Sequence, residues 1–518
     1  MSTSTPSFEE IDSLSLLAHK VAPHVYDLSS RQINVSIRDQ MVRAQQLVRD
    51  LHKADANAKS LLIVGMGAAG MTAALSACEV GFEQVCVVDV ATEPFALFEG
   101  VHSRFVGPYM YEWPSPFHGD QSYPSHEAAP WSKHGRSSLQ WAASEPISAD
   151  ALGRALRRGL REWLTASPPK AKVAPLMRVG VGKRVVKSYL KRYVGAQVQS
   201  WRDGLLGLPK SPPPPLVFTK AWGEPWGGAS ASSHWPAGVQ PDHIILAAGM
   251  GTEVLSVPGG GAPMTPRFWA NDKLKRPDVA HQCVVVLGGG DGAMQDALRS
   301  VTRFDHPLQF IRHLEAKPVV RQLLEAEVPA LLSADRQMRQ HSSWSSDPVG
   351  FAMVDAACVA AAQRLSRSPA VRAQVVSALR PGRGQVRLLA KGAHFDKAYL
   401  LNRFAVYLLA HCVCPATEHL SNAGGMGFDL KFGVEVLATH EMVGGGAPSW
   451  ILEIGPADES DVDVVEAHHI VVRFGIDTAS IPGLQMIQLT DPSLPGANSR
   501  QRTTLSRVEL PFVAMRGA

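Results

Sequence analysis

Two glycine-rich turns, each at the end of a short apolar run, constrain this chain more than any other feature of its sequence. The first spans Leu61 to Gly70 and reads LLIVGMGAAG, and the second spans Val284 to Ala293 and reads VVVLGGGDGA. Each turn is followed by small residues typical of a closely packed helix, and then by a further apolar run. This order predicts two strand–helix–strand units, each with a turn suited to a nucleotide phosphate.

The three glycines of the first turn have separate roles in such a unit. Gly65 allows a tight exit from the strand, and Gly67 allows the backbone to approach a pyrophosphate. Gly70 allows the following helix to pack closely on the strand. The alternative is a glycine turn that serves only the packing of helix on strand.

The residues that flank these glycines complete the predicted site. The helix that starts near Ala68 and Ala69 presents unpaired amides and a partial positive charge to the phosphate. Asp89 ends the next strand about 20 residues further on, where an acid accepts the ribose hydroxyls of a dinucleotide. Strand, turn, helix and acid therefore occur in the order that nucleotide binding requires.

The second turn, with Gly288 and Gly290, differs at the position of the acid. We expect its second strand at Leu308 to Ile311, which ends in Arg312. An arginine in place of the acid suits a 2′-phosphate, so the pattern favours NADP(H) over NAD(H). An ordinary surface position for Arg312 is the alternative.

Composition limits the classes of protein to which this chain can belong. With 518 residues it exceeds the size of a single core, so two or three domains are expected. A hydrophobic share of 45%, a charged share of 19% and a net charge of +4 describe an ordinary globular protein. We expect no nucleic-acid partner, no membrane partner and no apolar stretch long enough to span a bilayer.

Six cysteines form neither a disulfide framework nor a metal site by their spacing. Cys412 and Cys414 are separated by one residue, which is closer than redox or zinc pairs, and no second pair follows. No metal is therefore expected, and the polar N-terminus does not resemble a secretory signal. The prediction is a cytoplasmic protein that acts on a small molecule, with a homo-oligomer left open.

Breaks in the pattern divide the chain into four predicted parts. Residues 170–240 alternate short strand-like runs with proline and glycine, which predicts a small antiparallel meander, and residues 315–380 predict a helical insertion. The parts are a helical extension at 1–58, a domain around the first glycine turn at 59–265, a domain around the second glycine turn at 266–475 and a C-terminal segment at 476–518 that returns to the first domain.

The order of these motifs resembles that of flavoproteins with two dinucleotide-binding domains, such as thioredoxin reductases and flavin-containing monooxygenases. Ile244 to Gly249 is similar to the Ala-Thr-Gly strand that closes their FAD domain, with Ala248 in place of threonine. The second turn is similar to the reductases' Gly-Gly-Gly-Asp-Ser-Ala, with Asp291 matching their aspartate. The resemblance covers roughly residues 58–475 through short motifs, and it implies FAD at the first turn and NAD(P)H at the second.

The chain also departs from these families. It has no Cys-x-x-Cys pair, which argues against a disulfide reductase. The sequence motif of Baeyer–Villiger and flavin-containing monooxygenases is absent, and no late Gly-Asp motif is evident near the C-terminus. These departures leave the reaction open within the superfamily.

A dense aromatic and charged segment, residues 103–114, follows the first strand–helix–strand unit. It supplies the candidate catalytic residues Arg104, Tyr109, Tyr111 and Glu112, and Arg104 is also a candidate cofactor ligand. The segment is similar to one in uncharacterised bacterial FAD-dependent oxidoreductases, as are residues 268–272 and 401–404. A loop that only packs between the domains is the alternative, and no catalytic acid or base is assigned.

These observations predict an α/β protein with two Rossmann-like domains, the second inserted in the first. The expected function is that of an FAD-dependent oxidoreductase, monooxygenase-like, in which NAD(P)H reduces the flavin and a small organic substrate is oxidised or oxygenated. One alternative is an oxidase or dehydrogenase that its substrate reduces directly, with a vestigial NAD(P) domain. A second is a non-catalytic nucleotide-binding or sensing protein.

Overall fold

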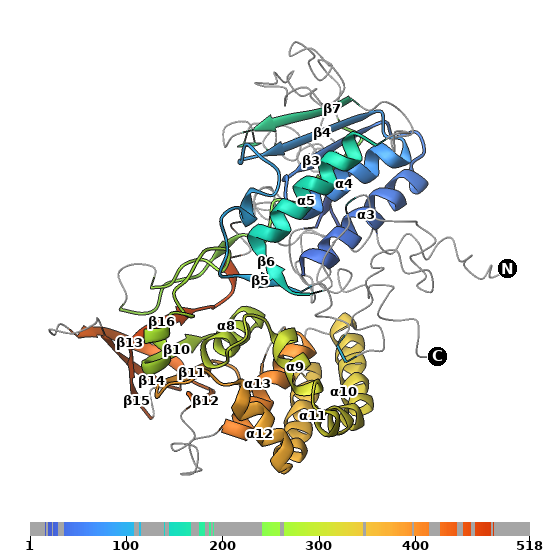
Figure 1. Cartoon of the computed structure of the whole chain (residues 1–518). Coiled ribbons are helices and arrows are strands. Elements are labelled where there is room, and N and C mark those ends of the chain that lie inside the picture. Colours follow the sequence, from blue (N-terminus) through green and yellow to red (C-terminus); the bar gives the residue numbers. More distant parts are fainter. Residues whose placement is uncertain are drawn as a thin grey trace, which may run out of the picture.

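A computed structural model of the chain shows a mixed α/β protein with two parallel sheets (Figure 1). It describes residues 16, 19–22, 24–28, 36–107, 113–114, 139, 145–166, 176–181, 186–187, 190, 241–259, 264–344, 349–395, 398–413, 425–442, 449–456, 461–477 and 480. One sheet and its helices form the first unit, and the other sheet and its helices form the second unit.

The first unit contains a six-stranded sheet in the order β1-β2-β8-β3-β4-β7, parallel except for β1. Its strands are β1 (Lys20–Ala22), β2 (Val25–Asp27), β3 (Ser60–Val64), β4 (Gln84–Asp89), β7 (Leu176–Val181) and β8 (His243–Leu246). Its other elements are α3 (Ile37–Ala54), α4 (Ala68–Val80), η1 (Ala96–Phe98), β5 (Phe105–Val106), β6 (Ile147–Ser148) and α5 (Ala149–Leu164). The predicted strand–helix–strand unit around the first turn is therefore present as β3, α4 and β4.

Two parts of the first unit differ from the expectation. Residues 1–58 are more than a helical extension, because β2 extends the sheet next to β8. Within residues 170–240 an antiparallel meander is wrong for 176–181, since this segment is β7, a parallel neighbour of β4. Most of the remaining predicted meander lies outside the described residues.

The second unit contains a four-stranded parallel sheet in the order β12-β11-β10-β16 and a three-stranded antiparallel sheet, β13-β14-β15. The strands are β10 (Cys283–Leu287), β11 (Gln385–Ala390), β12 (Gly427–Phe432), β13 (Glu435–Met442), β14 (Ser449–Gly455), β15 (Asp463–Ala467) and β16 (His469–Val472). The helices are η4 (Pro277–His281), α8 (Asp291–Val301), α9 (Pro307–Glu315), α10 (Pro318–Trp344), α11 (Val349–Ser366), α12 (Pro369–Ala378) and α13 (Leu400–Val413).

A short antiparallel pair marks where the chain leaves and re-enters the first unit. β9 (Thr252–Glu253) follows β8, and β17 (Ile476–Asp477) follows β16. The two strands pair through Ile476 and Glu253. Residues 476–477 are thus paired with the segment that follows β8, and all of 478–518 except residue 480 lies outside the described residues.

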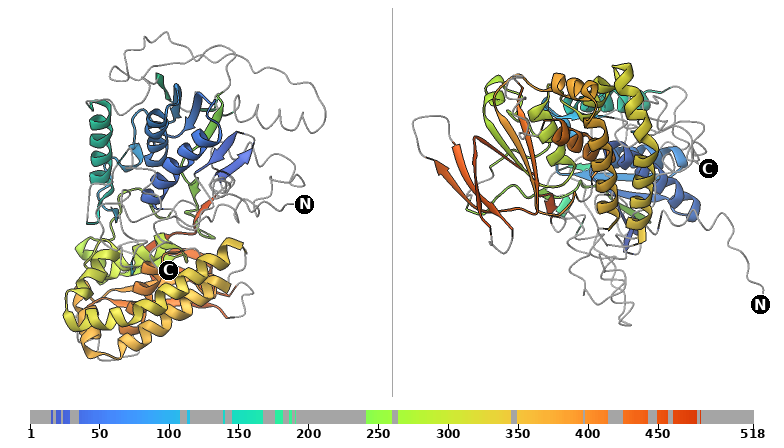
Figure 2. Two further views of the ribbon diagram at one scale, coloured as in Figure 1. Left: turned by 90° about the vertical axis from the view of Figure 1, so that its right-hand side faces the viewer. Right: turned by 90° about the horizontal axis from the view of Figure 1, so that it is seen from below.

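Alternating side chains bury both faces of each parallel sheet, as expected for strands covered on two sides. In β3, Leu61 and Ile63 pack with α3, α4 and α5, whereas Leu62 and Val64 belong to the cluster on the opposite face. In the second unit the helices cover one face of the parallel sheet, and β13, β14 and β15 cover the other. Figure 2 shows these helices and the three-stranded sheet on opposite sides.

The helical insertion is present, but it starts before the predicted residue 315. Helices α9 to α12 run from Pro307 to Ala378 between α8 and β11. α11 is long and apolar enough to cross a membrane by length and composition, which corrects the expectation that the chain has no such stretch. Half of that window is buried inside the molecule.

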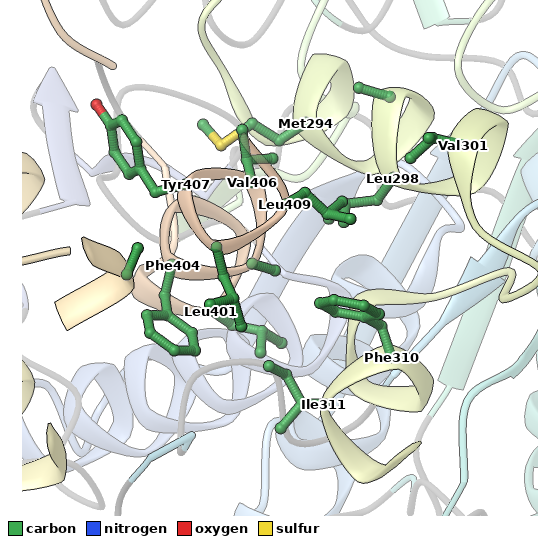
Figure 3. Close-up of a cluster of buried hydrophobic side chains, with 14 of the residues drawn as sticks. Met294, Leu298, Val301, Phe310, Ile311, Leu401, Phe404, Val406, Tyr407 and Leu409 are labelled. Atoms are coloured by element: carbon green, nitrogen blue, oxygen red, sulfur yellow. The ribbon is translucent and has the colours of Figure 1, made fainter. Parts of the chain in front are cut away.

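α13 connects the insertion to the parallel sheet by packing against both α8 and α9 (Figure 3). Leu401 and Phe404 of α13 lie near Ile311 of α9, and Leu409 lies near Leu298 of α8 (Figure 3). The Phe404 ring also stacks on Trp113, with 5.0 Å between the ring centroids. Phe404 is fully buried, so this packing stabilises the second unit.

We expect Phe404→Ala to lower the free energy of unfolding by about 3–5 kcal/mol, because it removes a buried ring and leaves a cavity. Urea denaturation followed by fluorescence measures the change. The control is Val319→Ala on α10, where the side chain is 54% exposed, with a change within about 0.5 kcal/mol. Equal losses in the two variants would contradict this account of the core.

Candidate functional site

The glycines of the first turn are of two kinds. Two are needed for close packing, and one has free space beside it. Gly65 has a φ of +117°, and a Cβ at this position would collide with the carbonyl oxygen of Ala247, after β8. A Cβ at Gly70 would collide with the carbonyl oxygen of Gly65. A Cβ at Gly67 would meet nothing within 4 Å. Gly65 and Gly70 therefore allow close packing, and only Gly67 leaves room for an approaching group.

The start of α4 lies next to this free space and suits a phosphate. The helix begins at Ala68, its N-cap is Gly67, and no side chain caps it. Its first turn, which includes Ala69, carries no acid. Unpaired N–H groups and the positive end of the helix dipole therefore remain available to an anion. The space at Gly67 and the uncapped amides together fit a pyrophosphate.

Asp89 lies beside the turn, at the carboxyl end of β4. One of its carboxylate oxygens accepts a hydrogen bond from the backbone N–H of Met66, and the other accepts one from the N–H of Ala91 at 2.8 Å. A carboxylate offers about four acceptor positions, so these two bonds leave capacity for a ribose hydroxyl. Ala248 and Gly249 follow β8 at the same edge, and Gly249 has a φ of +84° with open space beside it.

The second turn repeats the geometry of the first. Gly288 has a φ of +136°, and a Cβ there would collide with the carbonyl oxygen of Arg473. Its N–H donates to the carbonyl of Leu389 at 2.9 Å, as the N–H of Gly65 donates to Val88 at 2.7 Å. Gly290 is the N-cap of α8 and has no side-chain cap. The α8 N-terminus therefore corresponds to that of α4.

The expected second strand at Leu308 to Ile311 is wrong, because this segment lies in α9. β10 pairs with β11 and β16, and β11 is the neighbour that corresponds to β4. By register, Leu389 corresponds to Val88. Ala390 therefore occupies the place of Asp89, and Lys391 follows it. Arg312 lies on α9, not at the end of a strand, and forms an ion pair with Glu145. The strand next to the second turn therefore ends without an acid. The residue in the place of the acid is Ala390, and not the predicted Arg312.

The sequence itself contained signals that a helix, and not a strand, begins at Pro307. His306 caps α9 by accepting the N–H of Leu308 at 3.1 Å, and Gln309 accepts the N–H of His306 at 3.1 Å. Pro307 occupies the first helical position, where proline is favoured. A capping residue followed by proline indicates a helix start, and this signal outweighs the short apolar run.

Asp291, the first residue of α8, joins this helix to α13. Its carboxylate accepts hydrogen bonds from the N–H of Tyr399 at 2.8 Å and from the side chain of Asn402 at 2.6 Å. Burial raises the pKa of Asp291 to about 6, although both donors and the nearby Arg403 oppose this shift. The second turn thus carries an acid in its first helical turn, and the first turn does not.

Residues 268–272, highlighted by the sequence, lie against residues 100–103, at the start of the aromatic segment. The side-chain oxygen of Asn271 accepts the N–H groups of His102 and Ser103 at 2.7 and 3.1 Å, and its amide donates to the carbonyl of Gly100 at 2.7 Å. The N–H of Asp272 donates to the hydroxyl of Ser103 at 3.0 Å. Residues 268–272 therefore fix the start of the aromatic segment.

Arg104 does not lie exposed beside the first turn but in a buried cluster with charges from both units. We call Arg104, Asp272, Asp296, Arg299 and Arg473 the interdomain charge cluster. Arg104 pairs with Asp296 of α8 and lies 3.1 Å from Asp272. Arg299 bonds both aspartates, and Arg473 donates to Asp296 at 2.9 Å. The side chains of all five are at most 6% exposed, so solvent screens them little.

The charges around Asp296 control its protonation. Burial alone would raise the pKa of Asp296, but Arg104, Arg473 and Arg299 outweigh it and lower this pKa to about 2. Sequence reasoning missed Asp296, Arg299 and Arg473, because no spacing rule connects α8, residues 268–272 (the linker) and the residue that follows β16. The signal that could have revealed them in the sequence was a charged residue within an otherwise apolar strand or helix.

The rest of the aromatic segment extends into the second unit where it is described. Trp113 is buried against Phe404, and its indole N–H donates to Glu315 at 3.3 Å. Tyr109, Tyr111 and Glu112 lie outside the described residues. In residues 401–404, the fully buried Arg403 pairs with Asp355 of α11. Trp113 and Arg403 thus contribute to packing between elements.

The described residues contain no group of three or more His, Cys, Asp or Glu side chains that could hold a metal ion. None of the five described cysteines forms a disulfide, and Cys78, Cys86, Cys358 and Cys412 are buried.

Comparisons with known proteins place the chain near flavoenzyme structures at low similarity. No family model and no curated protein matches it. Thioredoxin reductase from Lactococcus lactis is 11% identical, aligned over 82% of this chain and 80% of its own, with a TM-score of 0.32. Bacillithiol disulfide reductase from Staphylococcus aureus is 10% identical over 80% and 76%, with a TM-score of 0.32.

A third solved structure is histamine dehydrogenase from Rhizobium sp. 4-9, which is 9% identical. It aligns over 89% of this chain but only 42% of its own, with a TM-score of 0.29.

We expect Asp296→Asn to destabilise the protein by about 3–5 kcal/mol, since it leaves three buried guanidiniums with a single aspartate. Arg104→Gln should cost less, because two guanidiniums still balance two aspartates. Thermal and urea denaturation of both variants measure this difference. Similar losses for the two variants would contradict the charge balance described here.

The loss of stability in Asp296→Asn should also depend on pH. Because the folded pKa of Asp296 lies below its unfolded value, its contribution is fully present above about pH 4 and is lost as pH falls toward 2. The wild type should therefore lose its advantage over Asp296→Asn across that interval. An advantage that is independent of pH would contradict an ionised Asp296.

Proposed function

We propose that this protein is an FAD-dependent oxidoreductase in which NAD(P)H, bound at the second turn, is the electron donor. The observation that carries the proposal is the free space at Gly67, beside the uncapped N-terminus of α4 and next to Asp89. A Cβ would fill this space, and no packing reason on the described residues requires a glycine there. A pyrophosphate is the group that such a turn accepts.

The residues at the first turn would hold the dinucleotide by complementary chemistry. The N–H groups at the start of α4 bind the pyrophosphate, and the remaining acceptor positions of Asp89 bind ribose hydroxyls. Ala248 and Gly249 form the adjacent edge of the site, where the small side chains leave the backbone accessible. Bound flavin would supply the redox chemistry, while the protein supplies binding and orientation.

The second turn supports a nicotinamide nucleotide with a preference for NADP(H). Gly288 and Gly290 reproduce the first turn, and Ala390 removes the acid that would repel a 2′-phosphate. Lys391 follows directly, its side chain is 77% exposed, and its ammonium lies 2.8 Å from Glu435. We assign to Lys391 the phosphate contact for which the sequence had suggested Arg312.

The substrate in this proposal is a small organic molecule that is oxidised or oxygenated. Transfer of electrons to a disulfide is disfavoured, because the chain has no Cys-x-x-Cys pair and the four cysteines named above are buried. Burial also raises the pKa of Cys412 to about 12, so its thiol stays protonated.

A second candidate is an oxidase or dehydrogenase that its substrate reduces directly, with no working nucleotide site in the second unit. Asp291 favours this alternative, because a negative charge in the first turn of α8 weakens phosphate binding. Reduction of the flavin by NAD(P)H in the absence of substrate distinguishes the two candidates.

The purified protein should be yellow and show a flavin spectrum, and Gly67→Val should abolish most of the bound FAD by filling the space at the turn. Absorbance after denaturation measures the flavin content. The matched control is Gly290→Val, which should retain FAD and lose reduction by NAD(P)H. A colourless wild type that cannot be reconstituted with FAD, or unchanged FAD in Gly67→Val, would overturn the proposal.

Lys391→Glu should lower kcat/KM for NADPH about tenfold or more, the effect of losing one charged hydrogen bond, and change that for NADH much less. Steady-state kinetics with both nucleotides measures the ratio. Lys317→Glu, an exposed lysine on the loop before α10, is the control and should leave the ratio unchanged. An unchanged ratio in Lys391→Glu would remove Lys391 from the nucleotide site.

A further inference from the structure

The interdomain charge cluster lies at the centre of a series of contacts that joins the two glycine turns. At the first turn, the carbonyl of Met66 accepts the N–H of Phe95 at 3.0 Å. Phe98, in the same short segment, packs edge-on against Trp269, with 5.5 Å between ring centroids. The segment after β4 is thus bound to the first turn at one end and to residues 268–272 at the other.

The second half of this series leads from the linker to the second turn. Asp272 and Arg299 form an ion pair at 3.0 Å, and Arg299 shares Asp296 with Arg104 and Arg473. The carbonyl oxygen of Arg473 is the atom that a Cβ at Gly288 would strike. One residue of the cluster is therefore in direct backbone contact with the second turn.

Phe268 fills the space between two of these guanidiniums. The Arg104 guanidinium lies 4.6 Å from its ring centroid, and that of Arg473 lies 5.8 Å away. The same ring lies 3.4 Å from where a Cβ at Gly292, the second residue of α8, would be. The linker residue thus contacts the first unit, β16 and the start of α8 at a single point.

Stability alone does not account for this cluster. Three arginines share two buried aspartates, with Glu253 only at the edge, 3.9 Å from Arg473. The Nε atoms of Arg104 and Arg299 and one Nη of Arg473 are buried with no hydrogen-bond partner among the described residues. Apolar side chains of similar size would remove this desolvation cost. Ion pairs are directional, however, and they specify one relative arrangement of the groups that they join.

We propose that Arg104 and Asp296 are positioning residues that fix the distance and orientation of the second glycine turn relative to the first. The inference rests on the proposed function, in which the two turns hold two nucleotides that must meet for electron transfer. Arg104 acts through the cluster and touches neither cofactor. It bridges Asp296 of α8 and Asp272 of the linker, so its removal frees the first unit from both.

The test uses the full chain and measures the arrangement without relying on bound cofactors. Spin labels carried by unnatural amino acids replace Glu83 before β4 and Glu325 on α10, which both lie on the surface. Pulsed electron resonance then reports the distance between the two units. The wild type should give one narrow distribution with or without NADPH, and Arg104→Gln should give a broader or second distribution.

Kinetics of the flavin-loaded protein supply the functional measurement. Arg104→Gln should retain wild-type FAD content and KM for NADPH, but reduce its flavin at least tenfold more slowly with saturating NADPH. Reduction by dithionite, which needs no nucleotide at the second turn, should be unchanged. Arg104→Lys keeps the charge but not both contacts, so it should give an intermediate rate. If Arg104→Gln does not fold, Arg104→Lys takes its place in every measurement.

Arg154→Gln is the matched control, because Arg154 is 62% exposed on α5 and pairs only locally with Asp150. It should leave the distance distribution and the rate of flavin reduction at wild-type values. A wild-type distribution with two populations, or a narrow one in Arg104→Gln, would overturn the proposal. So would a wild-type rate of flavin reduction in Arg104→Gln. If the wild type binds no flavin, the proposed function fails, while the distance measurement still tests the cluster.

Discussion

The pairing of Arg104 with Asp296 joins the two halves of this molecule, and the arrangement of its two glycine turns depends on it. The arginine comes from a segment that is hydrogen-bonded to the first turn, and the aspartate comes from the helix that starts at the second. Both side chains are buried, so their attraction is little screened by water or salt. Arg104, Arg473 and Arg299 lower the pKa of Asp296 to about 2, so the carboxylate is ionised at neutral pH.

The two turns have similar backbone geometry, but the residues beside them differ in charge. Each begins with a left-handed glycine that lies against the carbonyl of the closing strand, so both helices start in the same relation to their sheets. Asp89 lies beside the first turn, whereas Ala390 and Lys391 occupy that place in the second. The same fold therefore places an acid beside one turn and a cation next to the corresponding position of the other. This difference is the basis for proposing FAD at one turn and NADP(H) at the other.

Local sequence was sufficient for the first turn, because its strand, glycines, helix and acid are contiguous from Ser60 to Asp89. It was insufficient for the second, where five helices, α8 to α12, separate β10 from its partner β11. A short apolar run at Leu308 to Ile311 satisfied the strand pattern, but the cap at His306 and the packing of α9 on α13 stabilise a helix there. The helix cap and the tertiary packing together outweighed the short apolar run, so the assignment of Arg312 to a strand end was wrong.

The sequence by itself determined the glycine turns, the acid at the first of them and the helical character of the insertion. These features depend on backbone freedom and periodicity, which neighbouring residues decide. Only the tertiary structure decided that Ala390 faces the second turn, and that Arg104 pairs with Asp296 rather than facing the first turn. Strand register and buried ion pairs join residues that are distant along the chain, so no local pattern specifies them.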